Sequence, residues 1–383
     1  MKESGSFLAN RSNRRAFLKN GIVAAGAATV GGGLLGKAFS AFGQDGAGGL
    51  TQGDIAVLRL LAAAETIETD LWVQYSELGG TQDGEVSGVN GGNPLYAAAL
   101  QLLDGDMPQY IHDNTDDEIS HATFLNAYLA SKNAPTVNFD EFRTLPSSTA
   151  TGARQIGRLT NLMQLTVDTS WWTRYRSTTN PDFGAAFAQA VPSLAVGQHT
   201  AIPRSNADLA KSHLSSKSSQ TLSNHLKAIA FTAGFHFAYI EQGGTSLYAT
   251  LAQKVTSLEV LQILLSIGGS EIMHFQTWQD KAGNATPLTD FDPVNNSTVT
   301  FTDLTTGQPE TLQANLIMPE PCEFISPQLP PCAIIRPTGP GQLDATGVIN
   351  SFIADGLFIG QPQAFTDLLL EMAAEADQAQ RGV

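Results

Sequence analysis

A glutamate and a histidine three residues apart occur twice in this chain, each time in a stretch with helical periodicity. The pairs are Glu118 and His121 in "DDEISHATFLNAYL", and Glu271 and His274 in "GSEIMHFQTW". Residues three apart lie on one face of a helix, so both side chains of a pair can point at the same place. One pair alone is weak, because Glu118 could belong to a solvated acidic turn and His274 could be a hydrogen-bonded core histidine. Two pairs in two helices constrain the fold more strongly.

Four segments have apolar residues at helical spacing. They run over about 54–78, from about 94 to 131, over about 221–252 and over about 257–281. We expect the second segment to break near Gly105 or Pro108, and Gly243-Gly244 is a weak point in the third. The sequence therefore predicts a helical domain at 54–285.

A long insertion, 132–220, separates the second helix from the third. It contains a possible further helix at 156–176 and a polar stretch at 204–220 that indicates a loop. Trp171-Trp172, in "SWWTRYR", could form a binding surface, but packing against the helices is the favoured interpretation because tryptophan buries a large apolar area.

The chain changes character after residue 282. The stretches "STVTFTDL" and "TLQANLIM" alternate like strands, and short helices are expected near 345–355 and 362–380. Residues 286–383 are therefore predicted to form a carboxy-terminal extension with short strands and two helices. The expected fold class is mainly α with a partly β extension.

The other two helical segments each hold a glutamate in apolar surroundings: Glu65 in "LLAAAETIE" and Glu241 in "FHFAYIEQGG". A lone carboxylate there is costly unless it is paired or bound to a cation. Along the chain the order is Glu, Glu-x-x-His, Glu, Glu-x-x-His. Four-helix bundles that hold two metal ions between carboxylates supply their ligands in this way. Carboxylates can bridge two cations, and neutral imidazoles complete the ligand set.

This pattern resembles the ferritin-like superfamily, and within it the ferritin-like domain family that includes plant desiccation-related proteins. The similarity covers about 54–131 and 221–281. In that family an aromatic residue follows the glutamate of helices one and three by seven positions. Here Tyr248 follows Glu241 at that spacing.

The register of helix one is ambiguous in this resemblance. Trp72 follows Glu65 by seven positions, and Tyr75 follows Glu68 in the same way. We favour Glu65 as the ligand and keep Glu68 as the alternative. The resemblance thus implies a ferritin-like four-helix bundle whose metal ligands are Glu65 or Glu68, Glu118, His121, Glu241, Glu271 and His274.

The resemblance also implies a chemistry. The first expectation is two iron ions oxidised by oxygen or peroxide, as in ferroxidases, with Tyr248 or Trp72 supplying a nearby electron. Manganese would instead allow peroxide disproportionation, as in manganese catalases. The alternative from another class is a non-catalytic stress-protective or structural bundle. The insertion and the extension argue against a ferritin-like cage, while a smaller homo-oligomer stays open.

The first 43 residues differ from the rest of the chain. Arg14 and Arg15 precede "AFLK" and a weakly apolar run rich in Gly and Ala at 20–36. This resembles a twin-arginine signal peptide, which would direct the protein through that export machinery to the periplasm or outside the cell. A basic amino-terminal helix or a membrane anchor is the alternative. No other apolar run is long enough to span a bilayer, so we expect no membrane insertion after cleavage.

Charge and cysteine content narrow the partners and the compartment. The formal net charge of -15 argues against nucleic acid and anionic membranes as partners. The two cysteines, Cys322 and Cys332, lack the spacing of zinc or thioredoxin motifs. With an export signal, a disulfide between them is favoured.

None of the remaining histidines belongs to a Glu-x-x-His pair, so none is assigned to the predicted site. We expect them to lie at the surface or behind the ligands. They are His112, His199, His213, His225 and His236.

Overall fold

The computed structural model describes residues 49–175, 187–216, 219–309, 312, 321–334 and 344–382. The elements named below all belong to the unit Leu50–Val383. The export signal predicted at 1–43 lies outside the described residues, as does nearly all of the strand predicted at 311–318. None of the described helices is both long enough and apolar enough to cross a membrane.

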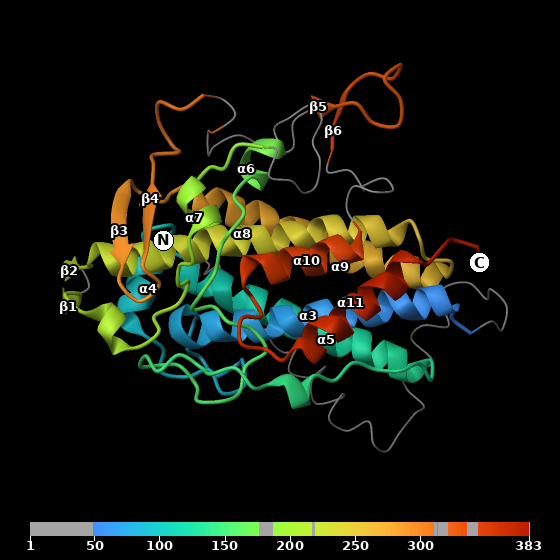
Figure 1. The fold of residues 1–383 in the computed structure, drawn as a ribbon, viewed down its shortest axis with the longest axis horizontal. Coiled ribbons are helices and arrows are strands. Elements are labelled where there is room, and N and C mark those ends of the chain that lie inside the picture. Colours follow the sequence, from blue (N-terminus) through green and yellow to red (C-terminus); the bar gives the residue numbers. More distant parts are fainter. Residues whose placement is uncertain are drawn as a thin grey trace, which may run out of the picture. The chain divides into compact units, whose positions relative to one another are not determined.

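Four long helices lie side by side in this unit (Figure 1). They are α3 (Gln52–Gly79), α5 (Met107–Ser131), α8 (Asn224–Ala252) and α9 (Leu258–Ala282). Helix α3 packs on α5, and α8 packs on α9. The prediction of a mainly helical protein is confirmed. The second predicted segment is divided into α4 (Pro94–Leu100) and α5, as expected, whereas α8 continues without a break through Gly243-Gly244.

Side-chain caps begin three of the long helices. Thr51 and Asp54 form a capping box at the start of α3, and Ser223 and Ser257 cap α8 and α9. Each cap satisfies a backbone N–H that would otherwise lack a partner. Asp54 also accepts a hydrogen bond from the Thr256 N–H at 2.8 Å, which ties the start of α3 to the start of α9.

An aromatic cluster joins three of the helices in the core. Trp72 of α3 stacks on Phe237 of α8 and on Trp278 of α9, with ring centroids 4.9 and 5.2 Å away. Thr115 of α5 adds a hydrogen bond to the Trp72 carbonyl at 3.2 Å. These large rings fill the space between the helices and so fix their spacing.

The insertion between α5 and α8 has little regular structure. Its elements are η1 (Asp140–Phe142), α6 (Trp171–Arg174), α7 (Pro192–Val196), η2 (Asn206–Leu209), β1 (His213–Ser216) and β2 (Ser219–Thr221). The helix predicted at 156–176 is wrong apart from α6. The loop predicted at 204–220 contains a short hairpin, β1–β2. Trp171 and Trp172 are fully buried against α9 and α8, so packing is their observed role.

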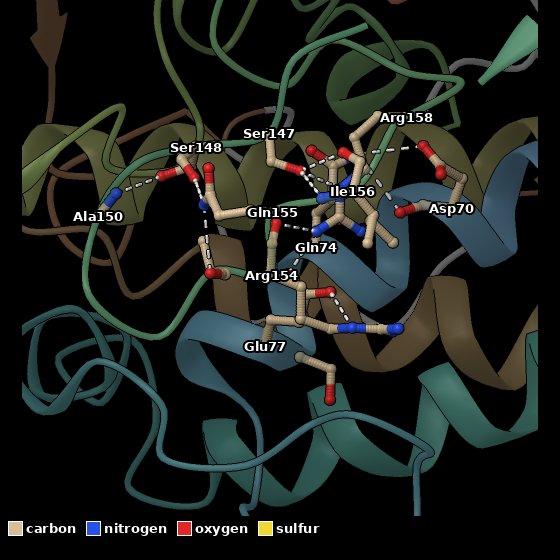
Figure 2. A network of polar contacts seen from close by, with 12 residues as sticks. Asp70, Gln74, Glu77, Ser147, Ser148, Ala150, Arg154, Gln155, Ile156 and Arg158 are labelled. Carbon is tan, nitrogen blue, oxygen red and sulfur yellow. Dashed lines mark hydrogen bonds and ion pairs between the residues drawn. The ribbon is translucent and has the colours of Figure 1, made fainter. Parts of the chain in front are cut away.

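The backbone of the insertion bonds to side chains of α3 instead of forming a helix (Figure 2). Asp70 accepts hydrogen bonds from the N–H groups of Leu159 and Thr160, both at 3.0 Å. Glu77 accepts from Arg158 at 2.5 Å, and both of these side chains are buried. Because these donors are used by α3, the apolar periodicity of this segment does not produce a helix.

Parts of the carboxy-terminal region pack on the long helices from outside. Its elements are β3 (Leu288–Asp292), β4 (Ser297–Phe301), β5 (Pro321–Cys322), β6 (Cys332–Ala333), α10 (Ala345–Asp355) and α11 (Gln363–Asp377). Helix α11 packs on α3 and α10 (Figure 1). Both predicted helices and the strand β4 are present, while its partner β3 was missed. Phe301 of β4 packs edge-on against Phe231 of α8.

The two cysteines lie opposite each other in the short β5–β6 pair. Both are free thiols in this structure, with Cys322 buried and Cys332 exposed. The predicted disulfide is therefore absent, although the pairing brings the two residues to neighbouring strands.

Candidate metal centre

The four long helices direct six acidic and imidazole side chains into one interior region. Four of the six are carboxylates at most 1% exposed, and the two histidines are 9% exposed. They are Glu65 of α3, Glu118 and His121 of α5, Glu241 of α8, and Glu271 and His274 of α9. The structure thus brings together the six residues favoured from the sequence.

Three carboxylates surround His121. The distance from His121 Nδ1 is 3.1 Å to Glu118 Oε2, 3.3 Å to Glu271 Oε1 and 3.4 Å to Glu65 Oε2. The ligand atoms of these four residues all lie within 4.8 Å of one another. Three helices therefore contribute to this first group.

A second group of four forms around His274. Its Nδ1 lies 3.1 Å from Glu118 Oε1 and 3.2 Å from Glu241 Oε2, and Glu271 completes the set. Glu118 faces His121 with one oxygen and His274 with the other. Glu118 and Glu271 belong to both groups, so two neighbouring sites share two carboxylates.

Glu271 lies against the backbone of α8. A Cβ atom placed on Gly244 would be 2.5 Å from Glu271 Oε2, so only glycine leaves room for this carboxylate. The same oxygen is buried and has no hydrogen-bond partner among the described residues. A buried carboxylate oxygen without a donor is costly, and a cation would satisfy it.

Carboxylates outnumber basic groups in this region. Among the described residues, no Lys or Arg lies within 4.0 Å of the site carboxylates, whose charged partners are His121 and His274. Burial raises the pKa of Glu118 to about 7, and the nearby charges of Glu241 and Glu65 add to this shift. Burial, with the charges of Glu118 and Glu65, also raises the pKa of Glu271 well above its usual range.

The histidines respond in the opposite direction. Burial alone would lower the pKa of His121, but its hydrogen bonds to the surrounding glutamates outweigh burial and raise that pKa. The charge of Glu241 raises the pKa of His274 in the same way against burial. Without a cation the site therefore holds protons, which a bound metal ion would displace.

Glu68 lies outside both groups of ligand atoms. It is buried, and burial together with the charges of Glu65 and Glu271 raises its pKa well above the usual range. Of the two helix-one candidates, the geometry thus supports Glu65.

The two aromatic candidates differ in their position. The Tyr248 hydroxyl donates a hydrogen bond to Glu65 Oε1, so Tyr248 borders the site. Trp72 belongs to the aromatic cluster with Phe237 and Trp278. Its indole nitrogen forms no hydrogen bond with the six site side chains among the described residues.

Three supporting residues were missed in the sequence. The Asn114 amide donates to Glu118 Oε1 at 2.8 Å and to Glu241 Oε1 at 3.0 Å. Asp117 Oδ2 lies 3.0 Å from His274 Nε2, and Ser270 Oγ lies 3.2 Å from His121 Nε2. Asn114 stands four residues before Glu118, which is a spacing that could have identified it.

The remaining histidines lie away from the six residues. Of the two expected positions, the surface is observed for His213, which is exposed, whereas His112, His199 and His236 are at most 3% exposed. Their polar partners come from distant parts of the chain: His236 Nδ1, for example, lies 2.8 Å from the Tyr75 hydroxyl. Helical spacing could not predict such contacts.

Comparisons with protein-family models, with curated proteins and with solved structures each gave no match. The functional argument therefore depends on the geometry of the site.

Proposed function

We propose that the chain is a ferritin-like four-helix bundle whose interior binds two metal ions. The proposed metal is iron, and the proposed activity is that of an oxidase of the ferroxidase type. The observation that carries this proposal is the sharing of Glu118 and Glu271 between two four-ligand groups. Carboxylates that bridge two neighbouring cations offset the charge of both. Four-helix bundles with two metal ions supply such carboxylates from helices that carry Glu, Glu-x-x-His, Glu and Glu-x-x-His.

The residues present fit two divalent cations. Each group offers one imidazole nitrogen and three carboxylates, a donor set suited to iron or manganese. The excess of carboxylates over basic groups and the unpartnered Glu271 Oε2 both favour cation binding. Glu65 and Glu241 would each bind one ion, while Glu118 and Glu271 would bridge the two.

Bound ferrous ions would supply electrons for the reduction of oxygen or peroxide. The chain supplies orientation and protons. Asn114 holds Glu118 and Glu241 in place through two hydrogen bonds. Tyr248 holds a proton at its hydroxyl against Glu65, and burial raises the pKa of Tyr248 well above its usual range, which keeps that proton in place. The buried setting excludes bulk water from the carboxylates.

Export is a second part of the proposal. The twin arginines Arg14 and Arg15 support transport through the twin-arginine machinery. That route carries folded proteins, so a centre loaded with metal inside the cell would be retained. Periplasmic or extracellular location is the expected result, and cell fractionation of the full chain against an Arg14→Lys, Arg15→Lys variant tests it.

Metal binding is the experiment that decides between the dimetal site and a non-catalytic bundle. We expect anaerobic Fe²⁺ titration to give two equivalents per chain at the four-helix site. Changing His121 and His274 to Ala should abolish both, because each group then loses its imidazole. His213→Ala, at an exposed position, is the matched control and should change nothing. Folded wild-type protein that takes up no Fe²⁺ at these residues would support the non-catalytic alternative.

The reaction is tested separately on metal-loaded protein. We expect oxygen or peroxide consumption with ferrous iron, coupled to iron oxidation. Peroxide breakdown by the manganese-loaded protein, without activity on iron, would instead favour the manganese catalase type.

A further inference from the structure

A second histidine–carboxylate cluster lies outside the proposed dimetal centre. His112 stands near the start of α5, and Asp83 and Glu85 belong to the loop between α3 and α4. The cluster shares no residue with the six side chains of the centre. Ligand atoms of all three residues lie within 4.8 Å of one another.

The distances in this cluster are longer than those of hydrogen bonds and are compatible with ligands around one metal ion. His112 Nε2 lies 3.5 Å from Glu85 Oε2 and 3.8 Å from Asp83 Oδ2. Direct N–H···O bonds measure about 2.7–3.2 Å. Two ligands bound at about 2.1 Å to a tetrahedral Zn²⁺ ion lie about 3.4 Å from each other. The observed spacing leaves room for a cation between these atoms.

The histidine itself has no hydrogen-bond partner among the described residues. Its side chain is only 3% exposed, and Nδ1 is buried without a partner. Nε2 faces the two carboxylates. A buried imidazole normally makes at least one hydrogen bond. The His112 ring is an exception: it faces two carboxylates and forms a hydrogen bond with neither.

The loop is shaped to present both carboxylates to His112. The Glu85 N–H donates to Asp83 Oδ1 at 2.9 Å, which leaves Oδ2 facing the ring. Gly84 between them has φ of 78°, a conformation that glycine adopts readily. The Thr81 N–H bonds to the Pro108 carbonyl at 3.0 Å and so ties the loop to α5.

The negative charge of the two carboxylates in this cluster is not offset by a described Lys or Arg side chain. Among the described residues, Asp83 and Glu85 form no ion pair with Lys or Arg. Asp116, which is half-buried, follows His112 by four residues and so lies on the same side of α5. The cluster therefore combines an imidazole and an excess of carboxylates.

We propose that Asp83, Glu85 and His112 bind one divalent first-row metal ion, with Asp116 one helical turn away as a further oxygen donor. An imidazole with carboxylates suits Zn²⁺, Co²⁺ or Mn²⁺ better than Mg²⁺ or Ca²⁺, which prefer oxygen ligands alone. The ion would fasten the 81–93 loop to α5. This site is independent of the dimetal centre.

Anaerobic Co²⁺ titration, followed by the visible absorption of the bound ion, tests this site. We expect His112→Gln to bind one equivalent fewer than the wild type, and Glu85→Gln to weaken that equivalent by tenfold or more. Asp113→Asn is the matched control, because Asp113 is exposed on the same helix and bonds only to Gln109 in the described structure. It should retain every equivalent.

The comparison of variants separates this proposal from the proposed function. If the centre and the new site both bind, the wild type takes three equivalents and His112→Gln takes two. If only the new site exists, these numbers are one and none. Retention of the same stoichiometry and affinity by His112→Gln and Glu85→Gln would show an adventitious ion only and overturn the proposal. Circular dichroism of each variant establishes that it is folded. If His112→Gln does not fold, Glu85→Gln serves in its place, because the Glu85 side chain is 17% exposed and that of His112 only 3%.

Discussion

Helix α3 carries two kinds of buried carboxylate, and their surroundings differ. Asp70 and Glu77 face the insertion. Arg143 lies 2.8 Å from Asp70, and Arg158 lies 2.5 Å from Glu77 (Figure 2). Glu65 faces the other helices, where its charged partner is His121. Acids on one helix are thus neutralised by arginine on one side and left in excess on the other.

This difference separates a structural network from a candidate metal site. Asp70 also accepts hydrogen bonds from two backbone N–H groups and the Thr160 hydroxyl, so its oxygens are satisfied. In the centre, Glu271 Oε2 has no donor among the described residues. Among the described residues, Glu77 Oε1 is also buried without a hydrogen-bond partner, so burial alone does not indicate a cation site. What distinguishes the centre is that no Lys or Arg pairs with its described carboxylates, whereas Arg158 pairs with Glu77.

The largest effect is expected on the insertion side. Arg158→Met should lower the free energy of unfolding by about 3–5 kcal/mol, because it leaves Glu77 buried and without its closest cation. Urea denaturation of metal-free protein measures this. Arg154→Met is the control: its side chain is 37% exposed and 3.8 Å from Glu77, so about 1 kcal/mol or less is expected. Equal losses in both variants would contradict the comparison.

The centre should respond with the opposite sign. Glu118→Gln should raise the free energy of unfolding of the metal-free protein by roughly 1–3 kcal/mol at about pH 8. The reason is that burial and negative neighbours raise the pKa of Glu118 to about 7, so its charged form destabilises the folded state above that pH.

The matched control for Glu118→Gln is Glu77→Gln, the same substitution on the arginine side. It should destabilise the protein, because Arg158 loses its partner. If both substitutions destabilise equally in metal-free protein, the excess of negative charge in the centre is not a source of instability.

The sequence was most informative where both residues of a predicted ligand pair lie in one helix. Glu118 and His121 share a helical face, so their convergence followed from spacing alone. The choice of Glu65 over Glu68 could not be made in this way, because both lie in α3 and only the position of α5 and α9 decides which one meets His121.

Long-range contacts account for the failures. The helix predicted at 156–176 is absent because its backbone donors bond to Asp70, eighty-nine and ninety residues earlier in the chain. The partners of His112 lie in a loop before α4, which no local pattern connects with α5. Strand β3 was missed for a local reason instead, since "LTDFD" carries two aspartates and gives little strand signal.

His225 lies between two aspartates, one of which, Asp208, also pairs with Arg204. His225 Nδ1 lies 2.7 Å from Asp290 and Nε2 lies 3.0 Å from Asp208. The hydrogen bond to Asp208 is the largest cause that raises the pKa of His225 to about 9, against partial burial. Because the folded pKa exceeds the unfolded value of 6.5, the stabilisation is complete below about pH 6.5 and is lost as pH rises through about 9.

We expect His225→Gln to cost about 1 kcal/mol of unfolding free energy near pH 6, and much less near pH 10. The measurement is the difference between wild type and variant in urea denaturation at each pH, which cancels the titration of other groups. A difference that stays constant across this range would show that His225 acts by packing and not by charge.

The smallest effect on stability is expected from alanine substitutions at two adjacent glycines of α8, one of which lies against the centre. A Cβ on Gly243 would meet nothing within 4 Å, whereas a Cβ on Gly244 would lie 2.5 Å from Glu271 Oε2. Gly243→Ala should stabilise the protein by about 0.5–1 kcal/mol, since alanine favours helix over glycine, and leave metal binding unchanged.

Gly244→Ala gains the same helix propensity but displaces the Glu271 carboxylate, whose oxygen is the far end of a flexible side chain. Its stability in metal-free protein should change by less than about 1 kcal/mol. Its Fe²⁺ affinity should fall by about tenfold or more, because a shared ligand leaves its position. Isothermal titration of the two variants side by side is the measurement. Equal affinities would mean that Glu271 does not bridge two ions, while loss in both would place the effect in the helix backbone and not in the carboxylate.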